Sequence, residues 1–249
     1  MPLVTTDAVV LHTFRYGETS KIVRLLTRDH GPQSVIAKGA TNPKSKFGAR
    51  LQSLSEGVAS FFLKPTRDLH TLREFDVVVQ RPELSRDPRR FGASTALAEV
   101  VMRFAPAEAH PEIYELVVEV LGRLGVAAAD ELDSQTLAGL WTTIAALGFE
   151  PSVGQCARCG EMIPPGPARF SVSDGGFLCP GCSRGTMVHT LEPADRAVLE
   201  LLIAGQPEEV GPLEPKHAKA HRRLLVQFVE RHVAEGRELP ALTIWQGLS

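Results

Sequence analysis

From Val4 to Arg81 the chain is a series of short apolar runs that alternate with glycine, proline and polar turn residues. Short runs rich in β-branched residues and bounded by turn residues are typical of strands. They predict five strands, at residues 8–13, 22–27, 33–37, 58–63 and 69–79. Five short strands in one segment predict a small barrel, for which the OB-fold and SH3-like barrels are the alternatives.

A polar joint, RPELSRDPRR at residues 81–90, separates this segment from one with helical periodicity. Asp87 is a candidate helix cap with Pro88 in the first helical position. Apolar spacing predicts helices that begin at Pro88 and near Pro111, and helices over residues 134–147, 193–203 and 215–234. The expected fold is therefore α+β and multidomain, with a five-stranded OB-fold barrel at residues 1–82 and a mostly α-helical domain at residues 83–249.

The four cysteines of the chain are Cys156, Cys159, Cys179 and Cys182. Their Cys-x2-Cys-x19-Cys-x2-Cys spacing predicts a metal module at about residues 153–186, because each CxxC turn presents two thiolates to one ion. We expect one structural Zn²⁺ there, with iron as the alternative metal, since four thiolates leave no open coordination position for catalysis. Two unrelated buried cysteine pairs are the other interpretation, which the clustering disfavours.

Residues around the cysteines fit such a module. Phe170 and Phe177 are candidates for a small hydrophobic cushion between the two CxxC turns. Arg158, Arg169 and Arg184 are placed to offset the negative charge of a four-thiolate site, or to touch phosphate.

Charge is unevenly distributed along the chain, although the formal net charge is only -2. Residues 1–90 hold 15 Lys and Arg against 9 Asp and Glu, whereas residues 91–249 hold 12 against 20. The N-terminal part can therefore attract polyanions that the rest of the chain repels.

The basic stretch between residues 15 and 50 is the candidate nucleic-acid interface, and its loop GATNPKSKFGAR concentrates glycine and lysine. The alternative without a binding role is that these cations keep strand edges soluble. Aromatic residues that might stack on bases are Phe14, Tyr16 and Phe47, each of which fits a core position equally well. The candidate nucleic-acid-binding residues are Arg15, Lys21, Arg24, Lys38, Lys44, Lys46 and Arg50.

A second basic stretch, KHAKAHRR at residues 216–223, falls within the last predicted helix. Its cations are Lys216, Lys219, Arg222 and Arg223. They suit an acidic partner or phosphate, although a solvated helix face is the favoured interpretation.

The N-terminus has neither the basic start nor the apolar run of a secretory signal, and no run of about 18 apolar residues occurs anywhere. We therefore expect a cytoplasmic, nucleoid-associated protein without membrane contact. A reducing cytosol favours metal binding over disulfides for clustered thiols.

Two regions of the sequence resemble one family. The run AVVLHTFRYGETSKIVRLLTRDHGPQSVIAKGATNPKSKFGARLQSL, followed later by LGFEPSVGQCARCG and FSVSDGGFLCPGC, resembles the RecO family of DNA repair and recombination mediators. The resemblance spans essentially the whole chain, and its more specific features are Tyr16-Gly17-Glu18, Lys38-Gly39 and Lys44-Ser45.

The resemblance implies an N-terminal OB-fold, a helical C-terminal domain and a four-cysteine zinc site. It implies a non-enzymatic protein that binds single- and double-stranded DNA and anneals complementary strands. It also implies that the protein works with RecR and RecF to load RecA on DNA covered by single-strand-binding protein. Members of the family engage the acidic C-terminal tail of that single-strand-binding protein.

Two other classes of function remain open. A zinc-dependent nucleic-acid-modifying enzyme would need carboxylates or histidines around an open metal, but the eight histidines are scattered along the chain. A zinc-ribbon DNA-binding regulator would need a recognition helix with base-reading side chains, and none is evident.

Overall fold

The computed structural model describes residues 2–64 and 67–248, and the chain divides between residues 125 and 126 into two compact units. The first unit contains the barrel and the first three helices. The second contains the remaining helices and the cysteine module.

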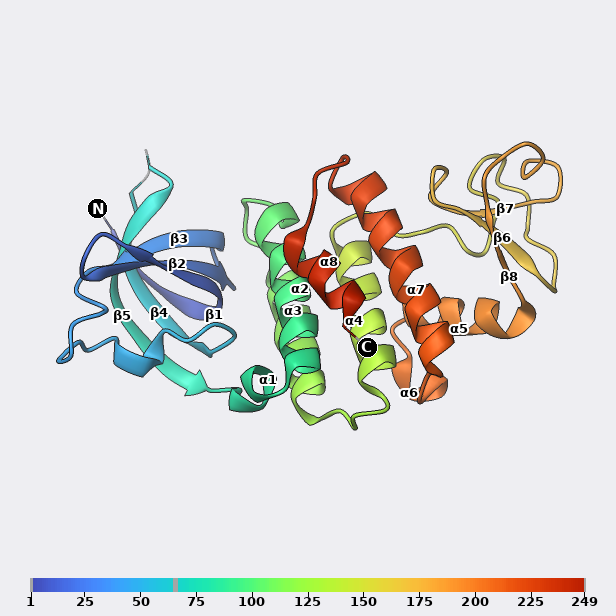
Figure 1. Ribbon diagram of the computed structural model, residues 1–249. Coiled ribbons are helices and arrows are strands. Elements are labelled where there is room, and N and C mark those ends of the chain that lie inside the picture. The colour runs from blue at the N-terminus through green and yellow to red at the C-terminus, as the bar shows by residue number, and fades with distance from the viewer. Residues whose placement is uncertain (1, 65–66, 249) are drawn as a thin grey trace. The chain divides into compact units, whose positions relative to one another are not determined.

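The N-terminal strands form a closed barrel (Figure 1). Around the barrel the order is β1-β2-β3-β5-β4, and β4 closes back onto β1. Neighbouring strands are antiparallel except for β3 and β5. This five-stranded closed arrangement confirms the expected OB-fold. The strands are β1 (Leu3–Tyr16), β2 (Ser20–Thr27), β3 (Gly31–Ala37), β4 (Glu56–Phe62) and β5 (Leu69–Val79).

The barrel interior is filled by alternate residues of the strands, such as Val23 and Leu25 of β2 and Val35 of β3. The long loop between β3 and β4 contributes Phe47 and Leu51 to the same core. This loop contains the short 3-10 helix η1 (Gly48–Arg50), which lies at the lower end of the barrel in Figure 1. Because its apolar residues are buried, the loop is part of the barrel's packing.

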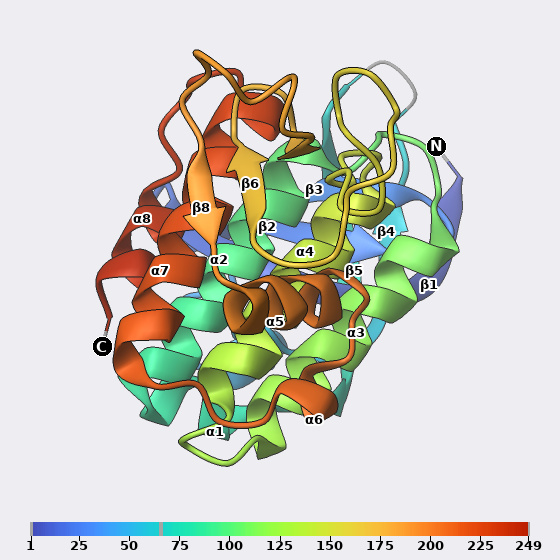
Figure 2. The same ribbon diagram turned by 90° about the vertical axis from the view of Figure 1, so that its right-hand side faces the viewer.

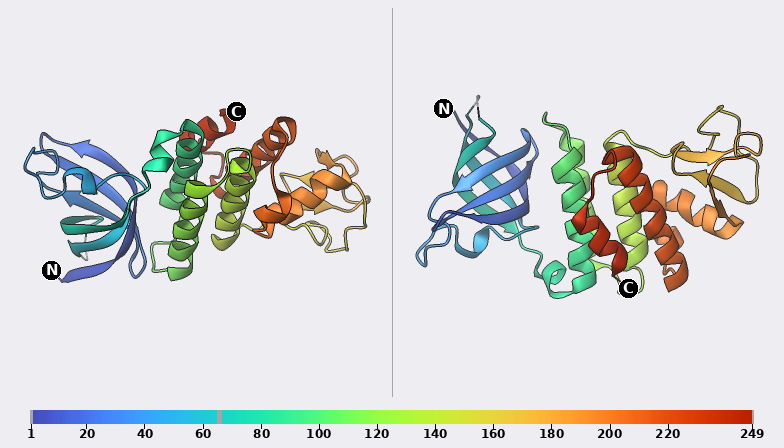
Figure 3. Two further views of the ribbon diagram at one scale, coloured as in Figure 1. Left: turned by 90° about the horizontal axis from the view of Figure 1, so that it is seen from below. Right: turned by 45° about the horizontal axis from the view of Figure 1, so that its top comes forward.

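Three helices follow the barrel in the chain, and they belong to the teal-to-green ribbons of Figure 3. They are α1 (Pro82–Arg86), α2 (Pro88–Phe104) and α3 (Pro111–Val126). The Asp87 side chain accepts hydrogen bonds from the N–H groups of Arg89 and Arg90, at 2.8 and 3.0 Å, which confirms the predicted cap.

Close contacts join these helices to the barrel. Arg28 after β2 pairs with Glu115 of α3 at 2.9 Å. Gly31 has a φ of +63°, and a Cβ there would lie 2.4 Å from the carbonyl oxygen of Glu108. Residues 83–125 are thus in the same compact unit as the barrel. The boundary that we predicted at residue 82 follows the change of secondary structure instead, and it stays a prediction.

The second unit consists of helices and a three-stranded sheet of order β7-β6-β8. Figure 2 shows β6 and β8 next to α5. Gly148, with a φ of +91°, follows the end of α4, close to the predicted helix end at residue 147. The elements are α4 (Leu132–Ala146), β6 (Ala168–Ser171), β7 (Gly176–Leu178), β8 (His189–Leu191), α5 (Pro193–Ile203), α6 (Pro207–Val210), α7 (Pro215–Phe228), the π-helical turn η2 (Val229–Val233) and α8 (Pro240–Gly247).

Buried aromatic rings connect the helices of this unit to its sheet. Trp141 of α4 meets Phe228 of α7 at a ring-centroid distance of 5.1 Å, and Phe228 lies 6.3 Å from Phe170 of β6. The cysteine module is therefore anchored to the helical core.

The structure refines the helix predictions. The helix expected over residues 215–234 is α7 followed by the wider π-helical turn. Helices α1, α6 and α8 were not predicted, because they are short and their apolar positions do not span several turns. Within the described residues, no helix is both long enough and apolar enough to cross a membrane.

Candidate metal centre and nucleic-acid interface

The four cysteines come together in the second unit. One Sγ atom from each of Cys156, Cys159, Cys179 and Cys182 lies within 4.8 Å of the others, and those of Cys159 and Cys179 are 3.8 Å apart. Four soft donors at such separations suit a single tetrahedral ion. The predicted ligand set is therefore positioned to hold one metal ion.

The β6–β7 hairpin explains why the two CxxC turns converge. Phe170 and Phe177 are fully buried and pack edge to face at 5.8 Å, which confirms the expected cushion. The first turn is fixed on β7 because the N–H of Ala157 donates to the carbonyl of Phe177 at 2.8 Å. The second turn follows β7 directly, since Cys179 is the residue after Leu178.

The thiols differ in acidity. Burial opposes ionisation of Cys156, but N–H groups of Cys179, Cys159 and Arg158 outweigh it and lower its pKa to about 6. The thiols of Cys159 and Cys179 raise the pKa of Cys182 to about 12. These N–H groups thus favour the thiolate form of Cys156, which is the form that binds a metal.

One neighbour of this site, Asp174 in the β6–β7 turn, could not be identified from the sequence. Its carboxylate accepts from Arg158, which lies inside the first CxxC turn. Sixteen residues separate the two, and only the hairpin brings them together.

Three of the seven predicted DNA-binding cations meet at one end of the barrel. Arg15 and Lys21 are directly opposite each other on β1 and β2, and Lys21 pairs with Ala37, next to Lys38. The N–H of Thr41 donates to the carbonyl of Thr19 at 3.0 Å, which holds the loop after β3 against the β1–β2 turn.

Three more of these cations lie in that loop, which we call the β3–β4 loop (residues 38–55). Lys44, Lys46 and Arg50 are exposed, and the ammonium group of Lys46 lies 5.3 Å from the centre of the Phe47 ring. Arg50 pairs with Asp76 at 3.5 Å. Among the residues that the structure describes, the other five cations form no ion pair, which leaves them available to anions. Those five are Arg15, Lys21, Lys38, Lys44 and Lys46.

Arg24 is placed differently from the other six. It is three residues from Lys21 on β2, so its side chain lies on the opposite face of the sheet. There its guanidinium contacts the Ser34 hydroxyl and borders a small hollow with Met102 of α2. The structure does not bring Arg24 together with the barrel-end cations, by which we mean the other six.

The three aromatic candidates for base stacking differ in exposure. Phe47 is only 3% exposed and belongs to the barrel core, so it is not available to stack on bases. Phe14 and Tyr16 are 40% and 53% exposed, and alternation along β1 places them on one face.

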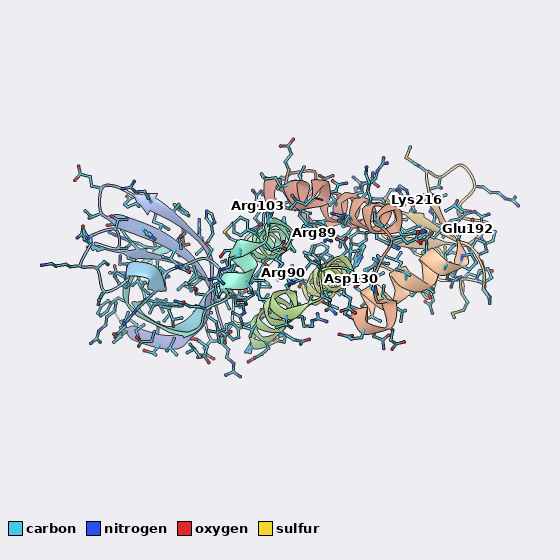
Figure 4. All side chains as sticks on the ribbon, turned by 60° about the horizontal axis from the view of Figure 1, so that its bottom comes forward. Arg89, Arg90, Arg103, Asp130, Glu192 and Lys216 are labelled. Atoms are coloured by element: carbon cyan, nitrogen blue, oxygen red, sulfur yellow. The ribbon has the colours of Figure 1, made fainter. Side chains whose placement is uncertain are left out.

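The cations of the second basic stretch do not all lie on the same face of α7. Lys216, Lys219 and Arg223 are exposed and follow one helix face; Figure 4 labels Lys216 at the start of α7. Placing Arg222 with them was wrong, because Arg222 is only 5% exposed. Its spacing of four from Ala218 and three from Leu225, both buried, could have revealed this from the sequence.

Comparisons with known proteins agree with this architecture. A family model for the N terminal of recombination protein O matches residues 1–81, and one for its C terminal matches residues 85–239. A DNA repair protein RecO from Streptomyces avermitilis is 31% identical over 95% of this chain and 96% of its own length.

Two further relatives carry the same name. RecO from Anaeromyxobacter sp. strain K is 32% identical over 97% of this chain and 95% of the relative. RecO from Bacillus subtilis strain 168 is 32% identical over 72% of this chain and 69% of the relative. With its barrel, its helical unit and its cysteine cluster, the chain belongs to the RecO family of DNA repair proteins.

Proposed function

We propose that this protein is a recombination mediator that binds single- and double-stranded DNA through the barrel-end cations and anneals complementary strands. The observation that carries the proposal is the group of five exposed or half-exposed cations without ion-pair partners among the described residues. Unpaired Lys and Arg side chains bind phosphates by releasing condensed counterions. In this proposal residues 1–82 act as the DNA-binding domain.

Annealing needs no covalent chemistry in this scheme. Two DNA strands repel each other through their phosphates, and cations bound along one strand reduce that repulsion. Base pairing then supplies the driving force, provided that the bases stay accessible. A surface that grips the backbone suits this requirement, because it leaves base edges free.

The RecO resemblance extends the proposal to partners. We propose that the protein works with RecR and RecF to load RecA on DNA covered by single-strand-binding protein. The exposed cations of α7, Lys216, Lys219 and Arg223, are a candidate contact for the acidic tail of that protein. Action on DNA would place the protein in the cytoplasm at the nucleoid.

We propose that the metal is a single structural Zn²⁺. The support is its ligand set, since four thiolates fill a tetrahedral coordination sphere. Bound there, the ion would cross-link the two CxxC turns. The same full sphere argues against a zinc-dependent nucleic-acid-modifying enzyme, and we propose no catalytic role.

The DNA-binding proposal is tested with two triple variants that remove the same charge. Lys38→Ala, Lys44→Ala and Lys46→Ala together remove barrel-end cations, and Lys216→Ala, Lys219→Ala and Arg223→Ala remove the α7 cations. Affinity for a fluorescent oligonucleotide is measured from low to high salt by anisotropy. The barrel triple should bind more weakly and lose about 0.7 to 0.9 of log–log salt slope for each phosphate contact removed.

The α7 triple is the matched control for net charge. It should keep the wild-type salt slope on naked DNA. Equal losses in both triples would mean that overall charge, and no particular surface, governs binding. A wild-type slope in the barrel triple would place the DNA site elsewhere.

Annealing is measured separately, by fluorescence quenching of complementary strands with and without single-strand-binding protein. The barrel triple should be slower in both conditions. The α7 triple should be slower only when that protein covers the strands.

A further inference from the structure

The side chain of Arg158 joins parts of the cysteine module that are distant in sequence. It lies between Cys156 and Cys159, in the first CxxC turn. Its Nη1 donates to the main-chain carbonyl of Cys182, in the second turn, at 2.8 Å. Its Nε and Nη2 donate to Oδ1 of Asp174 at 3.0 and 2.9 Å, and Nη2 also reaches Oδ2 at 3.1 Å.

The acceptor carboxylate is itself fixed. Asp174 Oδ2 accepts from the Ser171 hydroxyl at 2.5 Å and from the Ser173 hydroxyl at 3.2 Å. The N–H of Asp174 donates back to the Ser171 hydroxyl at 3.2 Å. Since Ser171 ends β6, these hydrogen bonds connect the guanidinium to the sheet of the module.

The second CxxC turn has few other attachments. Apart from thiol contacts, the described residues 180–187 form hydrogen bonds only with one another, with Cys179 or with Arg158. Arg158 also contacts the Thr186 hydroxyl at 3.3 and 3.4 Å. Without this arginine, a metal ion and the ends of the segment would be the main restraints on Cys182.

Arginine is the residue that suits these contacts. One edge of the guanidinium faces both oxygens of Asp174 while the remaining nitrogen reaches a carbonyl, which requires a planar fork of donors. A lysine ammonium keeps the charge but cannot hold both acceptors in this geometry.

We infer that Arg158 is a positioning residue for the four-cysteine metal site, which holds the second CxxC turn at the distance that the ion needs. Its contribution comes from these directed hydrogen bonds, and its positive charge alone does not replace them. This role is independent of whether the barrel binds DNA.

The test compares metal release from full-length variants loaded with Zn²⁺. The key variants are Arg158→Ala, Arg158→Lys and Asp174→Ala. Arg184→Ala is the matched control: Arg184 is exposed two residues after Cys182, and it forms no ion pair in the described part of the chain. Zinc content is measured first by mass spectrometry, and release to excess chromophoric chelator is then followed by absorbance.

We expect Arg158→Ala, Arg158→Lys and Asp174→Ala to lower zinc affinity about 10- to 100-fold, seen as faster release, while Arg184→Ala stays near wild type. Wild-type release from Arg158→Lys would show that charge suffices and would overturn the inference. Equal acceleration by Arg184→Ala would overturn it in the same way. If Arg158→Ala does not fold, Arg158→Lys and Asp174→Ala still decide the question, because both keep most of the local packing.

Discussion

At the scale of single residues, His70 illustrates how burial fixes a protonation state. It begins the buried part of β5, is 6% exposed and stacks on Phe61 at 5.8 Å. Its Nδ1 accepts a hydrogen bond from the N–H of Lys64 at 3.1 Å. Burial, and secondarily the charge of Lys64, lower the pKa of His70, so folding favours the neutral ring.

This burial makes stability depend on pH. As pH falls, the unfolded chain takes up a proton at the ordinary histidine pKa of about 6.5, before the folded chain does. The free energy of unfolding should therefore decrease as pH falls below about 6.5. His70→Asn keeps an acceptor for Lys64 but loses the ring that stacks on Phe61, so it should be less stable at neutral pH. Because asparagine does not titrate, the variant should lose less stability than wild type between pH 7 and pH 5.

Urea unfolding at both pH values measures the difference. His221 of α7, whose pKa burial also lowers, provides a residual pH dependence that both proteins share. An identical loss for His70→Asn and wild type would show that His70 does not contribute.

At the scale of elements, Arg222 connects three helices of the second unit. Its guanidinium contacts the Leu248 carbonyl after α8 and lies 3.7 Å from the Asp133 carboxylate of α4. Both charged groups are largely buried. Truncating Arg222 removes a buried guanidinium from both contacts, and breaking a buried charge pair in this way is strongly destabilising.

Arg222→Ala should lower the free energy of unfolding by about 3 to 5 kcal/mol. Arg223→Ala is the matched control, because the next residue along α7 is exposed and should change stability by less than about 0.5 kcal/mol. Chemical denaturation of both variants checks the prediction. Similar small effects would mean that the contacts of Arg222 add little.

The cap of α2 is a second prediction for an element. Asp87→Ala removes the acceptor for two N–H groups and should cost about 1 kcal/mol, whereas Asp87→Ser keeps a capping oxygen and should cost much less. Denaturation midpoints of the two variants give the comparison. No difference between them would argue that the cap is dispensable.

At the scale of the whole molecule, the metal should stabilise one part of the chain. The cysteine module packs on the helices of residues 126–249 through Phe170 and Phe228. Purified protein should contain one metal per chain, and less than about half a mole would contradict the four-ligand site.

Chelation should then loosen the module and leave the barrel protected. Hydrogen exchange followed by mass spectrometry should show faster exchange in β6 and β7 after metal removal, with β1 to β3 unchanged. Uniform acceleration across both units would contradict a local structural role.

The sequence predicts the regular regions of the structure better than the irregular ones. The five strands and the helices at 88–104 and 193–203 follow from local periodicity and turn residues, because those signals act between neighbours along the chain. The candidate metal ligands follow from spacing alone, since a CxxC turn is a local structure. Short helices such as α6 carry too few residues for a period to show.

By itself the sequence determined the strand pattern, the candidate ligand set and the concentration of positive charge near the N-terminus. Only the tertiary structure decided that Arg24 lies apart from the barrel-end cations, that Phe47 is buried, and that Arg158 meets Asp174. The physical reason is that strand register, loop packing and helix contacts join residues far apart in sequence. Local propensity contains no information about which of these partners a side chain will meet.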